Sequence, residues 1–300
     1  MNYGRTSLRR RAKQLDARGT RIRHKIGVIL GKLLLIGIIV GGCAAVSFGV
    51  GAFKGILASA PDISEVDVIP TGYSTKVLAA DGSETAKLVA AGSNRQYVTI
   101  DQIPEDLQHA VVAIEDERFY DHNGIDLKGI VRALVADVRT RDFSQGASTL
   151  TQQLIKNNVL NEQWANENDS NISKIEKMER QVQRKIQEQY LAIELEKKVN
   201  DKNWILENYL NAINLGQNTL GVGVASERYF GKDVSDLTLS ECAVLAAITQ
   251  NPSKYNPITN PQENSKRRMK VLNNMKDQGY ISQEEYDEAV ADNVYDRIQL

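Results

Sequence analysis

The chain has 300 residues and a formal net charge of −1, and this length suits a short anchor followed by one domain of roughly 200 residues. The charges are segregated: residues 1–25 hold nine Lys or Arg and a single acid, Asp16, which leaves a net charge of −9 on the rest of the chain. Of the two cysteines only Cys242 lies outside the apolar N-terminal run, which excludes an internal disulfide beyond that run. No CxxC, HExxH or histidine cluster occurs, so we expect no structural metal site. Cys242 itself stands in a helical apolar run and is expected to be a buried small hydrophobe.

An uncharged apolar run near the N-terminus predicts a membrane anchor. It covers residues 33–53, between two lysines, and 21 helical residues span a hydrocarbon core of about 30 Å. A basic tail can also be a nucleic-acid-binding arm, but the apolar run makes it the flank of an anchor, so no nucleic-acid partner is expected. The positive-inside rule places residues 1–32 in the cytoplasm and the chain after the run outside the cell membrane, extracellular or periplasmic. The alternative is a cleaved signal peptide with Ala-Ser-Ala at 58–60 as its exit, although its apolar region is usually shorter.

Beyond the anchor, the sequence predicts a small β element and then a mainly helical domain. "TKVLAADGSETAKLVAA" (75–91) has two apolar runs around Asp81-Gly82, which predicts a hairpin. From Pro104 onward the apolar periodicity is that of helices, which we expect over 104–116, 126–139, from 149, 176–198, 201–213, 239–250, 261–276 and 282–292. The expected layout is a tail (1–32), an anchor (33–53), a linker with the hairpin (54–100), a helical domain (101–280), and a C-terminal helix and linker (281–300).

Four segments are expected to lack regular structure. Residues 161–175 are polar and Asn-rich and predict a mobile loop, and residues 216–231 are Gly-rich and predict turns. The prolines of "NPSKYNP" (251–257) predict an extended segment. The final "DNVYDRIQL" is interpreted as a linker.

Two adjacent acids form the first candidate site. Glu115 and Asp116 end a helix that otherwise has the apolar pattern of a core helix, with Val111 and Val112 on its buried side. Acids at a helix C-terminus lie against the negative end of its dipole. Helix stability therefore does not explain them, and a functional role is the alternative.

The helix that begins at Thr149 carries the second candidate site. "TLTQ" predicts a capping box with Gln152, and Thr149, Gln152, Gln153 and Lys156 share one face at i, i+3, i+4 and i+7. Such a face is often only the solvated side of a helix. Short neutral donors with one cation, however, suit a phosphate or sugar ligand better than a plain surface.

The long helix over 176–198 carries the third. Arg180, Arg184 and Glu188 lie at i, i+4 and i+8, opposite an apolar face that includes Val182 and Tyr190. One interpretation is a surface ion pair worth about 0.3–0.5 kcal/mol. The other is an anion clamp of two arginines that the glutamate orients.

If the fold brings the three sites together, the result is a cleft with one or two carboxylates and several cations. Such a cleft fits attack by a hydroxyl on a carbon that carries a phosphate leaving group. A carboxylate removes the proton, and cations stabilise the departing diphosphate. An external, membrane-anchored domain favours a lipid-linked substrate.

The same residues resemble the signatures of the peptidoglycan glycosyltransferases, the glycan-polymerising domains of class A penicillin-binding proteins and monofunctional transglycosylases. The resembling stretches stand in family order and cover roughly residues 70 to 280: "EDERFYDHNG" (115–124), "GASTLTQQLIKN" (146–157), "RKIQE" (184–188), "KNWILENYLN" (202–211) and "LSECAVLAAITQNPSKYNP" (239–257). The resemblance implies a mainly α, lysozyme-like, two-lobed fold with a small β element after one transmembrane helix. It also implies that lipid II is polymerised into β-1,4 glycan with inversion and release of undecaprenyl diphosphate, with Mg²⁺ assisting.

The resemblance also implies roles for individual residues. Glu115 matches the general base, Asp116 its partner acid, and Glu188 the second glutamate, which helps to hold the diphosphate or its cation, while His122 is expected to be structural. The family's basic residues near the phosphates are matched by Lys156, Arg180, Arg184 and Arg132. Positions that line the donor and acceptor sites are matched by Phe119, Ser148, Thr149, Gln152, Gln153 and Asn157.

Two departures and two rival functions accompany this reading. Ala147 stands where many relatives have a glycine. The stretch of sequence between Asn157 and Arg184 contains more residues than expected. A lytic muramidase of similar fold would explain Glu115 but not the basic residues or the anchor. An inactive scaffold that binds cell-wall precursors, or proteins of cell-wall synthesis or division, would have lost the acids and cations named above. All of them are present in this sequence. S-x-x-K and K-T-G do not occur, so a transpeptidase domain is expected to be absent from these residues.

Overall fold

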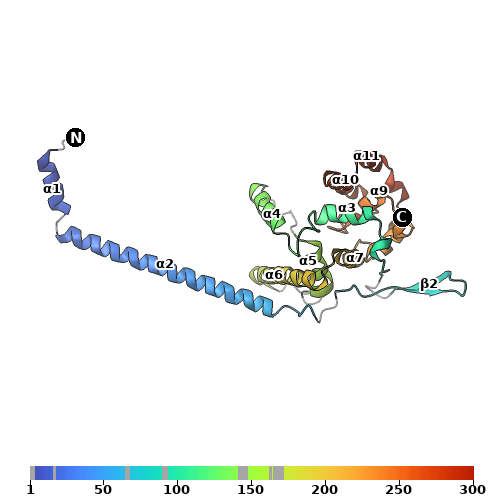
Figure 1. The fold of residues 1–300 in the computed structure, drawn as a ribbon, viewed down its shortest axis with the longest axis horizontal. Helices are drawn as coiled ribbons and strands as arrows, with labels where there is room; N and C mark the ends of the chain where they lie inside the picture. Colours follow the sequence, from blue (N-terminus) through green and yellow to red (C-terminus); the bar gives the residue numbers. More distant parts are fainter. Residues whose placement is uncertain are drawn as a thin grey trace. The chain divides into compact units, whose positions relative to one another are not determined.

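The computed structural model describes residues 4–15, 18–64, 68–89, 94–140, 148–161, 164 and 172–300. Backbone contacts divide the chain into two units, Met1–Ser59 and Ala60–Leu300. The first unit consists of helices α1 (Arg5–Leu15) and α2 (Arg18–Ala58), drawn in blue in Figure 1. Within α2, the stretch Ile22–Ala58 is long and apolar enough to cross a membrane, as a membrane anchor or a signal sequence would be. The expected anchor over 33–53 lies inside it.

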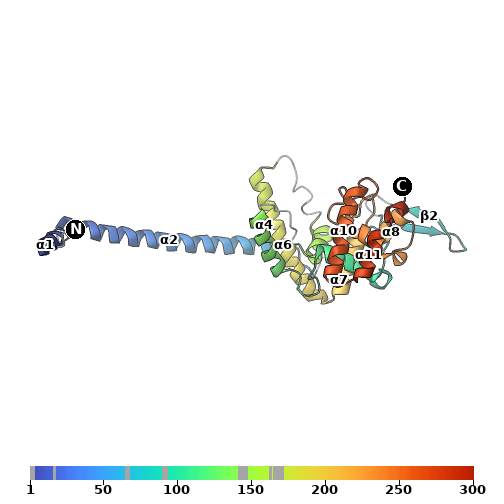
Figure 2. The ribbon, with the colours of Figure 1, turned by 90° about the horizontal axis from the view of Figure 1, so that it is seen from above.

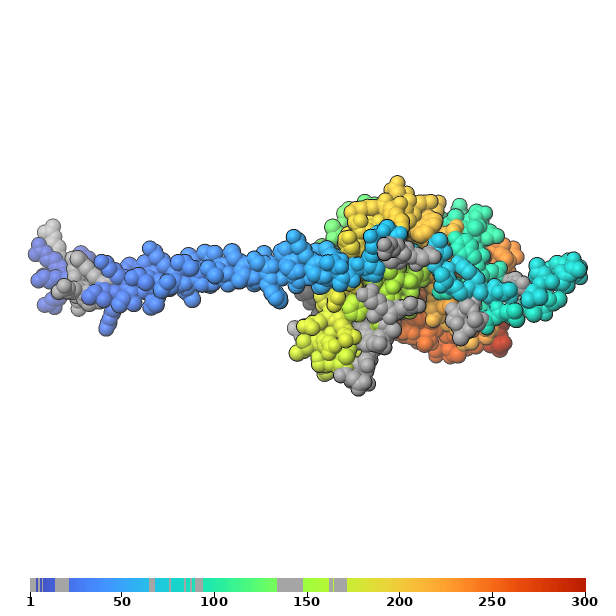
Figure 3. Space-filling view, turned by 90° about the horizontal axis from the view of Figure 1, so that it is seen from below, coloured from blue at the N-terminus to red at the C-terminus, as the bar shows by residue number. Residues whose placement is uncertain are grey.

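The second unit begins with the expected hairpin. Strands β1 (Thr75–Leu78) and β2 (Glu84–Leu88) are antiparallel, and Lys76 is paired with Lys87. The side chain of Asp81 accepts hydrogen bonds from both the N–H and the hydroxyl of Ser83, at 3.0 and 2.6 Å, which closes the turn. The hairpin projects from the helices (Figures 1 and 3), and the prediction of a small β element is confirmed.

The rest of the unit is helical, as predicted. Its α-helices are α3 (Glu105–Glu115), α4 (Leu127–Thr140), α5 (Leu150–Ile155), α6 (Lys174–Val199), α7 (Lys202–Ala212), α8 (Val222–Phe230), α9 (Leu239–Ile248), α10 (Pro261–Asp277) and α11 (Gln283–Ala291). Shorter turns are η1 (Ile100–Gln102), the π-helical η2 (Lys156–Leu160), η3 (Val234–Asp236) and η4 (Val294–Arg297). The predicted loop over 161–175 lies mostly outside the described residues.

Two groups of helices build the core. In one, α9 and α10 pack against α3 (Figure 1), and α11 packs against α10 (Figure 2); in the other, α5 packs against α6 and α7. Every residue from Ser240 to Ile248 is buried, including Cys242, because α9 is apolar on nearly all sides and lies inside the domain. A capping box between Thr238 and Glu241 begins this helix. The last residue of α3, Glu115, contacts both groups, through Arg267 of α10 and Gln153 of α5.

Three of the segments expected to be irregular differ from the prediction. Residues 216–221 do turn, but Val222–Phe230 forms α8, so the second half of the predicted turn region was wrong. Gly221, with φ +85°, lies so close to Asn211 that a Cβ would come within 2.8 Å of its carbonyl oxygen. The glycines of this region thus serve close packing beside a helix as well as turning.

"NPSKYNP" folds into turns and is not extended. The side chain of Asn251 accepts a hydrogen bond from the Lys254 N–H at 3.0 Å, and its carbonyl accepts one from the Tyr255 N–H at 3.0 Å. Pro252 is compatible because proline favours the second position of such turns. The turns bring residues 251–255 close to the end of α9.

The C-terminal residues expected to form a linker pack on the domain. Val294 is fully buried, and the Arg297 guanidinium pairs with Glu241 at 2.9 Å and Asp292 at 2.7 Å. The periodic pattern of this short stretch is too brief to reveal its buried side.

The apolar side chains of α4 and α6 are exposed, unlike those of a core helix. Leu127 and Val131 of α4 are 65% and 61% exposed, and Val182 and Tyr190 of α6 are 53% and 36% exposed. Ile175 and Met178, near the start of α6, are also exposed. These helices therefore present apolar side chains on the outside of the domain, where a soluble surface would be polar.

Candidate active site

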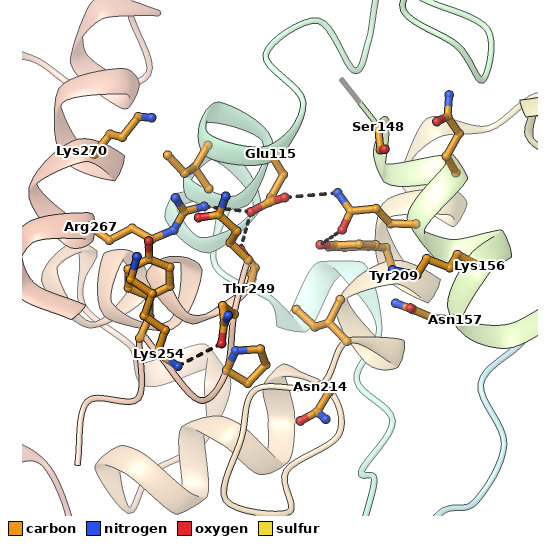
Figure 4. Close-up of a pocket in the computed structure, with 18 of the residues that line it drawn as sticks. Glu115, Ser148, Lys156, Asn157, Tyr209, Asn214, Thr249, Lys254, Arg267 and Lys270 are labelled. Atoms are coloured by element: carbon orange, nitrogen blue, oxygen red, sulfur yellow. Dashed lines mark hydrogen bonds and ion pairs between the residues drawn. The ribbon is translucent and has the colours of Figure 1, made fainter. Parts of the chain in front are cut away.

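Glu115 is the last residue of α3, and three side chains hold its carboxylate. One oxygen accepts hydrogen bonds from the Thr249 hydroxyl at 2.6 Å and the Arg267 guanidinium at 3.2 Å. The other accepts one from the Gln153 amide at 3.1 Å. Figure 4 shows the carboxylate in the middle of a cleft, reached by side chains from α5, α10 and the end of α9. A carboxylate offers about four lone-pair directions, so one remains for a ligand.

Tyr209 fixes the orientation of Gln153. Its hydroxyl donates a hydrogen bond to the Gln153 amide oxygen at 3.1 Å, so the amide nitrogen must face Glu115. Burial, helped by the charges of Glu115 and Asp116, raises the pKa of the Tyr209 phenol well above its ordinary value. The phenol is therefore protonated at any physiological pH and remains a donor.

Asp116 points into the protein rather than into the cleft. It is 6% exposed, its oxygens lie 3.0 Å from Nε2 of His122, and one of them accepts a hydrogen bond from the Leu150 N–H at 2.9 Å. The acid thus fastens the loop after α3 to the first turn of α5, where the helix dipole favours negative charge. This placement gives both Asp116 and His122 structural contacts.

Gly124 allows the same loop to lie against α6. Its φ is +86°, and a Cβ would come within 2.5 Å of the carbonyl oxygen of Ala192. Its own carbonyl accepts a hydrogen bond from the Thr149 hydroxyl at 2.7 Å. The glycine of the first signature therefore serves close packing, which any side chain would prevent.

Part of the polar face that begins at Thr149 is buried, so the interpretation as a plain solvated surface was wrong. Thr149 and Gln152 are each 1% exposed, and the Thr149 hydroxyl caps α5 by accepting from the Gln152 N–H at 3.2 Å. The predicted capping box forms only in this half, because the Gln152 side chain points to Gly124 and Lys185 instead. Lys156 follows α5 at the start of η2 and is exposed.

Lys185 connects α5 to α6. Its ammonium donates hydrogen bonds to the Ser148 hydroxyl at 2.7 Å and the Gln152 amide oxygen at 2.9 Å, and it lies 3.1 Å from Glu188. Sequence reasoning missed this residue, although it follows Arg184 directly in "RKIQE". The spacing along one helix face includes Arg184 but not its neighbour, which lies about 100° further around the helix.

Glu188 is nearly buried, with 4% of its side chain exposed. One oxygen meets Lys185, and the other lies 3.5 Å from Nε of Arg184. That second contact is an ion pair too long for a hydrogen bond, and the oxygen accepts none from the described residues. It retains the capacity to bind a cation or a donor.

A cleft of about 1620 Å³ joins these groups. Eight Lys or Arg and three Glu line it, in a chain whose net charge is −1. The predicted site residues in its lining are Glu115, Arg132, Ser148, Gln152, Gln153, Lys156, Asn157, Arg184 and Glu188. The cleft is therefore strongly electropositive and concentrates anions.

Four predicted site residues are outside this lining. Asp116 and Thr149 are buried in the contacts described above. Phe119 is fully buried in the core, where its ring lies 4.6 Å from the Lys202 ammonium. Arg180 pairs with Glu176 at 2.9 Å within α6. Arg132 does line the cleft, and its guanidinium pairs with Glu117 at 2.6 Å.

Apart from Arg132, the cations of the cleft form two groups. Figure 4 shows Lys156 on one side of Glu115 and Arg267 and Lys270 on the other. The first cation group is Lys156, Arg184 and Lys185; the second is Lys254, Lys266, Arg267 and Lys270. Sequence reasoning missed the second group, although the spacing of Lys266, Arg267 and Lys270 puts all three on one face of α10. No apolar-to-polar contrast marks that face, because α10 is polar over most of its length.

Comparisons with known proteins identify the family of this chain. The family model described as Transglycosylase matches residues 81–276. Penicillin-binding protein 1A/1B of Bacillus subtilis is 38% identical over 258 residues, which are 86% of this chain and 25% of that protein. Penicillin-binding protein 1A of Escherichia coli is 39% identical over 239 residues, or 79% of this chain and 26% of that protein. This chain spans about a quarter of the length of these relatives.

Among solved structures, penicillin-binding protein 1A from Haemophilus influenzae is similar over 75% of this chain and 21% of that chain, with 24% sequence identity and a TM-score of 0.39.

Proposed function

Because the chain belongs to the transglycosylase family and contains a peptidoglycan transglycosylase domain, we propose that its cleft polymerises lipid II into β-1,4-linked glycan. The observation that carries this proposal is the placement of the Glu115 carboxylate in the same cleft as the first cation group. A base and a set of cations are the two requirements for displacing a diphosphate by a hydroxyl.

In the proposed reaction, Glu115 is the general base. It takes the proton from the 4-hydroxyl of the acceptor sugar, and that oxygen attacks the anomeric carbon of the donor. The new C–O bond forms on the face opposite the leaving group, so the configuration inverts. The bond between the anomeric carbon and the diphosphate oxygen breaks, and its electron pair leaves with undecaprenyl diphosphate.

The three donors around Glu115 support this role by holding the carboxylate in place. Thr249 and Gln153 are neutral and hydrogen-bond the carboxylate from two sides, while Arg267 supplies one positive charge. A base held this firmly loses little entropy on reaching the reactive geometry.

The first cation group is the proposed binding site of the leaving diphosphate. Lys185 is held by Ser148, Gln152 and Glu188, so its charge has a defined position before the substrate binds. Lys156 is exposed at the cleft surface and makes no ion pair among the described residues. Positioned cations stabilise the charge that develops on the leaving group without reorganising.

We include Mg²⁺ in the proposal, bound mainly by the substrate. The described residues contain no group of three His, Cys, Asp or Glu side chains that could hold a metal by themselves. The Glu188 oxygen that accepts no hydrogen bond from the described residues fits as one protein ligand, because Mg²⁺ commonly takes one or two carboxylates together with substrate phosphates. Such an ion would neutralise part of the diphosphate charge.

We also propose that α2 anchors the chain in the cell membrane, with residues 1–32 in the cytoplasm and the domain outside. The nine basic residues before the apolar stretch support this orientation. The exposed apolar side chains of α4 and α6 support contact of the domain with lipid, where such side chains are favourable. Cell-wall synthesis or division proteins are the partners expected of such an enzyme.

The decisive experiment incubates the detergent-solubilised chain with purified lipid II and Mg²⁺ and then digests the product with lysozyme. We expect lysozyme-sensitive polymer from the wild type, and none from Glu115→Gln, which should still bind lipid II. Glu105→Gln is the matched control, because Glu105 is exposed at the opposite end of α3. Equal polymer from Glu115→Gln would remove Glu115 from the base role, and no polymer from a wild type that binds lipid II would favour a scaffold.

A further inference from the structure

Helix α1 has the highest density of positive charge among the described helices, and the proposed reaction gives it no role. Five of its 11 residues are Lys or Arg and none is acidic. Among the described residues, four of these cations are exposed and form no ion pair: Arg9, Arg10, Arg11 and Lys13. Their charge is therefore available to a ligand outside the chain.

This helix is too short and too highly charged to be stable by itself. An isolated helix of fewer than about 12–15 residues is marginal in water, and like charges four residues apart destabilise it further. Arg9 and Lys13 are such a pair. Leu8 is 60% exposed, so apolar packing on the rest of the chain does not compensate. A partner that neutralises the cations would supply the missing stability, and such a partner is anionic.

The cations of α1 border an apolar stripe. Leu8 and Ala12 lie four residues apart and share one line along the helix. At about 100° per residue, Arg9 and Arg11 lie about 80° to either side of that line. Arginines in these positions can bury their stems beside apolar side chains while their guanidinium groups reach polar headgroups. This arrangement is that of a helix lying in the plane of a membrane surface.

A nucleic acid is another polyanion for such a helix, but two observations favour lipid. Binding to the phosphates of a nucleic acid needs no apolar stripe, because it depends on charge. In addition, α1 ends at Leu15 and α2 begins at Arg18, shortly before the stretch Ile22–Ala58 that is apolar enough to cross a membrane. A chain anchored by that stretch keeps α1 near the headgroups at a high effective concentration.

We propose that α1 lies on the cytoplasmic surface of the membrane and binds the phosphates of anionic phospholipids. This inference rests on the part of the proposed function in which α2 anchors the chain. Guanidinium groups bind phosphate oxygens through paired hydrogen bonds, and each basic residue near an anionic surface adds to the attraction.

Binding of α1 at the surface also has a consequence for α2. The apolar stretch of α2 has 37 residues, whereas about 20 helical residues span a hydrocarbon core. Apolar length alone therefore does not determine which part of α2 occupies the core. A basic helix held at the headgroups selects one depth, because it limits how far α2 can move along its axis.

The test uses the full chain carrying Leu8→Trp, reconstituted into vesicles of phosphatidylcholine alone or of phosphatidylcholine with phosphatidylglycerol. Lipids brominated near the headgroup, present in both leaflets, quench an indole at the surface whichever way the chain is inserted. The signal of the wild type, which comes from Trp164 and Trp204, is subtracted. We expect the added indole to be quenched at least about threefold more strongly in the anionic vesicles. About 1 M NaCl should abolish the difference, because charges are then screened beyond about 3 Å.

A charge variant adds Arg9→Gln, Arg10→Gln and Arg11→Gln, and its matched control has Lys at the same three positions. The Gln variant should lose at least about two thirds of the lipid-dependent quenching, and the Lys control should keep most of it, because the attraction depends on charge. Equal quenching in the two vesicle types, or equal quenching of the Gln and Lys variants, would overturn the inference. So would tight binding of a DNA duplex by the solubilised chain without a response to anionic lipid.

Flotation of the same vesicles separates this inference from the proposed anchor, and neither measurement depends on polymerisation. If α2 spans the membrane, the chain floats with both vesicle types even at high salt. A chain that floats only with anionic vesicles at low salt would remove α2 as the anchor and still support lipid binding by α1. A chain that floats with neither type would overturn both.

Discussion

Glu115 and Glu188 line the same cleft and are both largely buried, yet their neighbours differ in kind. Glu115 is held by a hydroxyl, an amide and one guanidinium, and it belongs to the end of α3. Glu188 faces two cations of α6, Lys185 and Arg184, and one of its oxygens accepts no hydrogen bond from the part of the chain that the structure describes. A carboxylate held mainly by neutral donors is suited to accept a proton, whereas one among cations is suited to organise them.

Shortening Glu115 should have the largest effect on turnover. Glu115→Asp withdraws the carboxylate by about 1.5 Å, the length of one C–C bond. We expect polymerisation to fall about 100-fold, because the base no longer reaches both its donors and the acceptor hydroxyl. Initial rates with lipid II at saturating Mg²⁺ measure this, and lipid II binding serves as the folding control. If Glu115→Asp and Glu188→Asp lost activity equally, the distinction between the two acids would not hold.

Neutralising Glu188 should have the next largest effect and a different signature. Glu188→Gln keeps the shape of the side chain but removes its negative charge. The charge holds Lys185 in place, and the carboxylate is the proposed ligand of Mg²⁺. We expect about a 30-fold loss of activity and a much weaker response to added Mg²⁺. The measurement is a Mg²⁺ titration of the rate in the wild type and the variant. An unchanged Mg²⁺ dependence would exclude Glu188 as a ligand of the ion.

Removing the hydroxyl next to Glu115 tests whether the carboxylate must be held. Thr249→Val preserves the shape of the side chain but deletes the 2.6 Å hydrogen bond. We expect kcat to fall about tenfold with KM unchanged, because the base is less well positioned while substrate contacts remain. Thr249→Ser retains the hydroxyl and should restore most of the rate. A change in KM alone would assign Thr249 to substrate binding instead.

Glu241 extends the comparison of Glu115 and Glu188 to a buried acid that lies outside the cleft. Replacing it should leave turnover almost unchanged at neutral pH. Burial by itself raises its pKa, but hydrogen bonds from Lys232, the Thr238 N–H and Arg297 outweigh burial and lower it. A lowered folded-state pKa gives stability that is present above the unfolded value of about 4.3 and is lost as the pH falls through the folded value.

Glu241→Gln should therefore destabilise the domain by about 2 kcal/mol at pH 7 and flatten the acid side of its stability profile. Thermal unfolding of the full chain in detergent between pH 3 and 7 measures this. A large loss of turnover in a folded variant would mean that burial and pairing alone do not separate structural acids from functional ones.

Much of the fold was predictable because its signals lie within a few residues of one another. The hairpin turn at Asp81-Gly82, the end of α3 at Glu115 and the burial of Cys242 follow from turn chemistry and apolar periodicity. The periodicity of α6 was equally clear, but it did not reveal that Val182 and Tyr190 lie on the outside of the domain. Periodicity identifies an apolar face and says nothing about what that face meets.

Much of the candidate site was predictable because short motifs contain it. Glu115, Gln153 and Glu188 stand in such motifs and were predicted. Lys185 stands in one as well, but it was missed because it lies about 100° around α6 from Arg184. Ser148 and Gln152 reach Lys185 from α5, and no pattern within α6 encodes that contact.

By itself the sequence determined most of the helices, though not α8, together with the apolar N-terminal segment and the motifs that supply the carboxylates and part of the cations. Only the tertiary structure decided what holds Glu115, since Thr249 and Arg267 are 134 and 152 residues away in the chain. It also placed Asp116 and Phe119 inside the protein and the second cation group in the cleft. The physical reason is that α9 and α10 reach α3 through apolar packing, which is non-directional, so the polar partners it brings together leave no local pattern in the sequence.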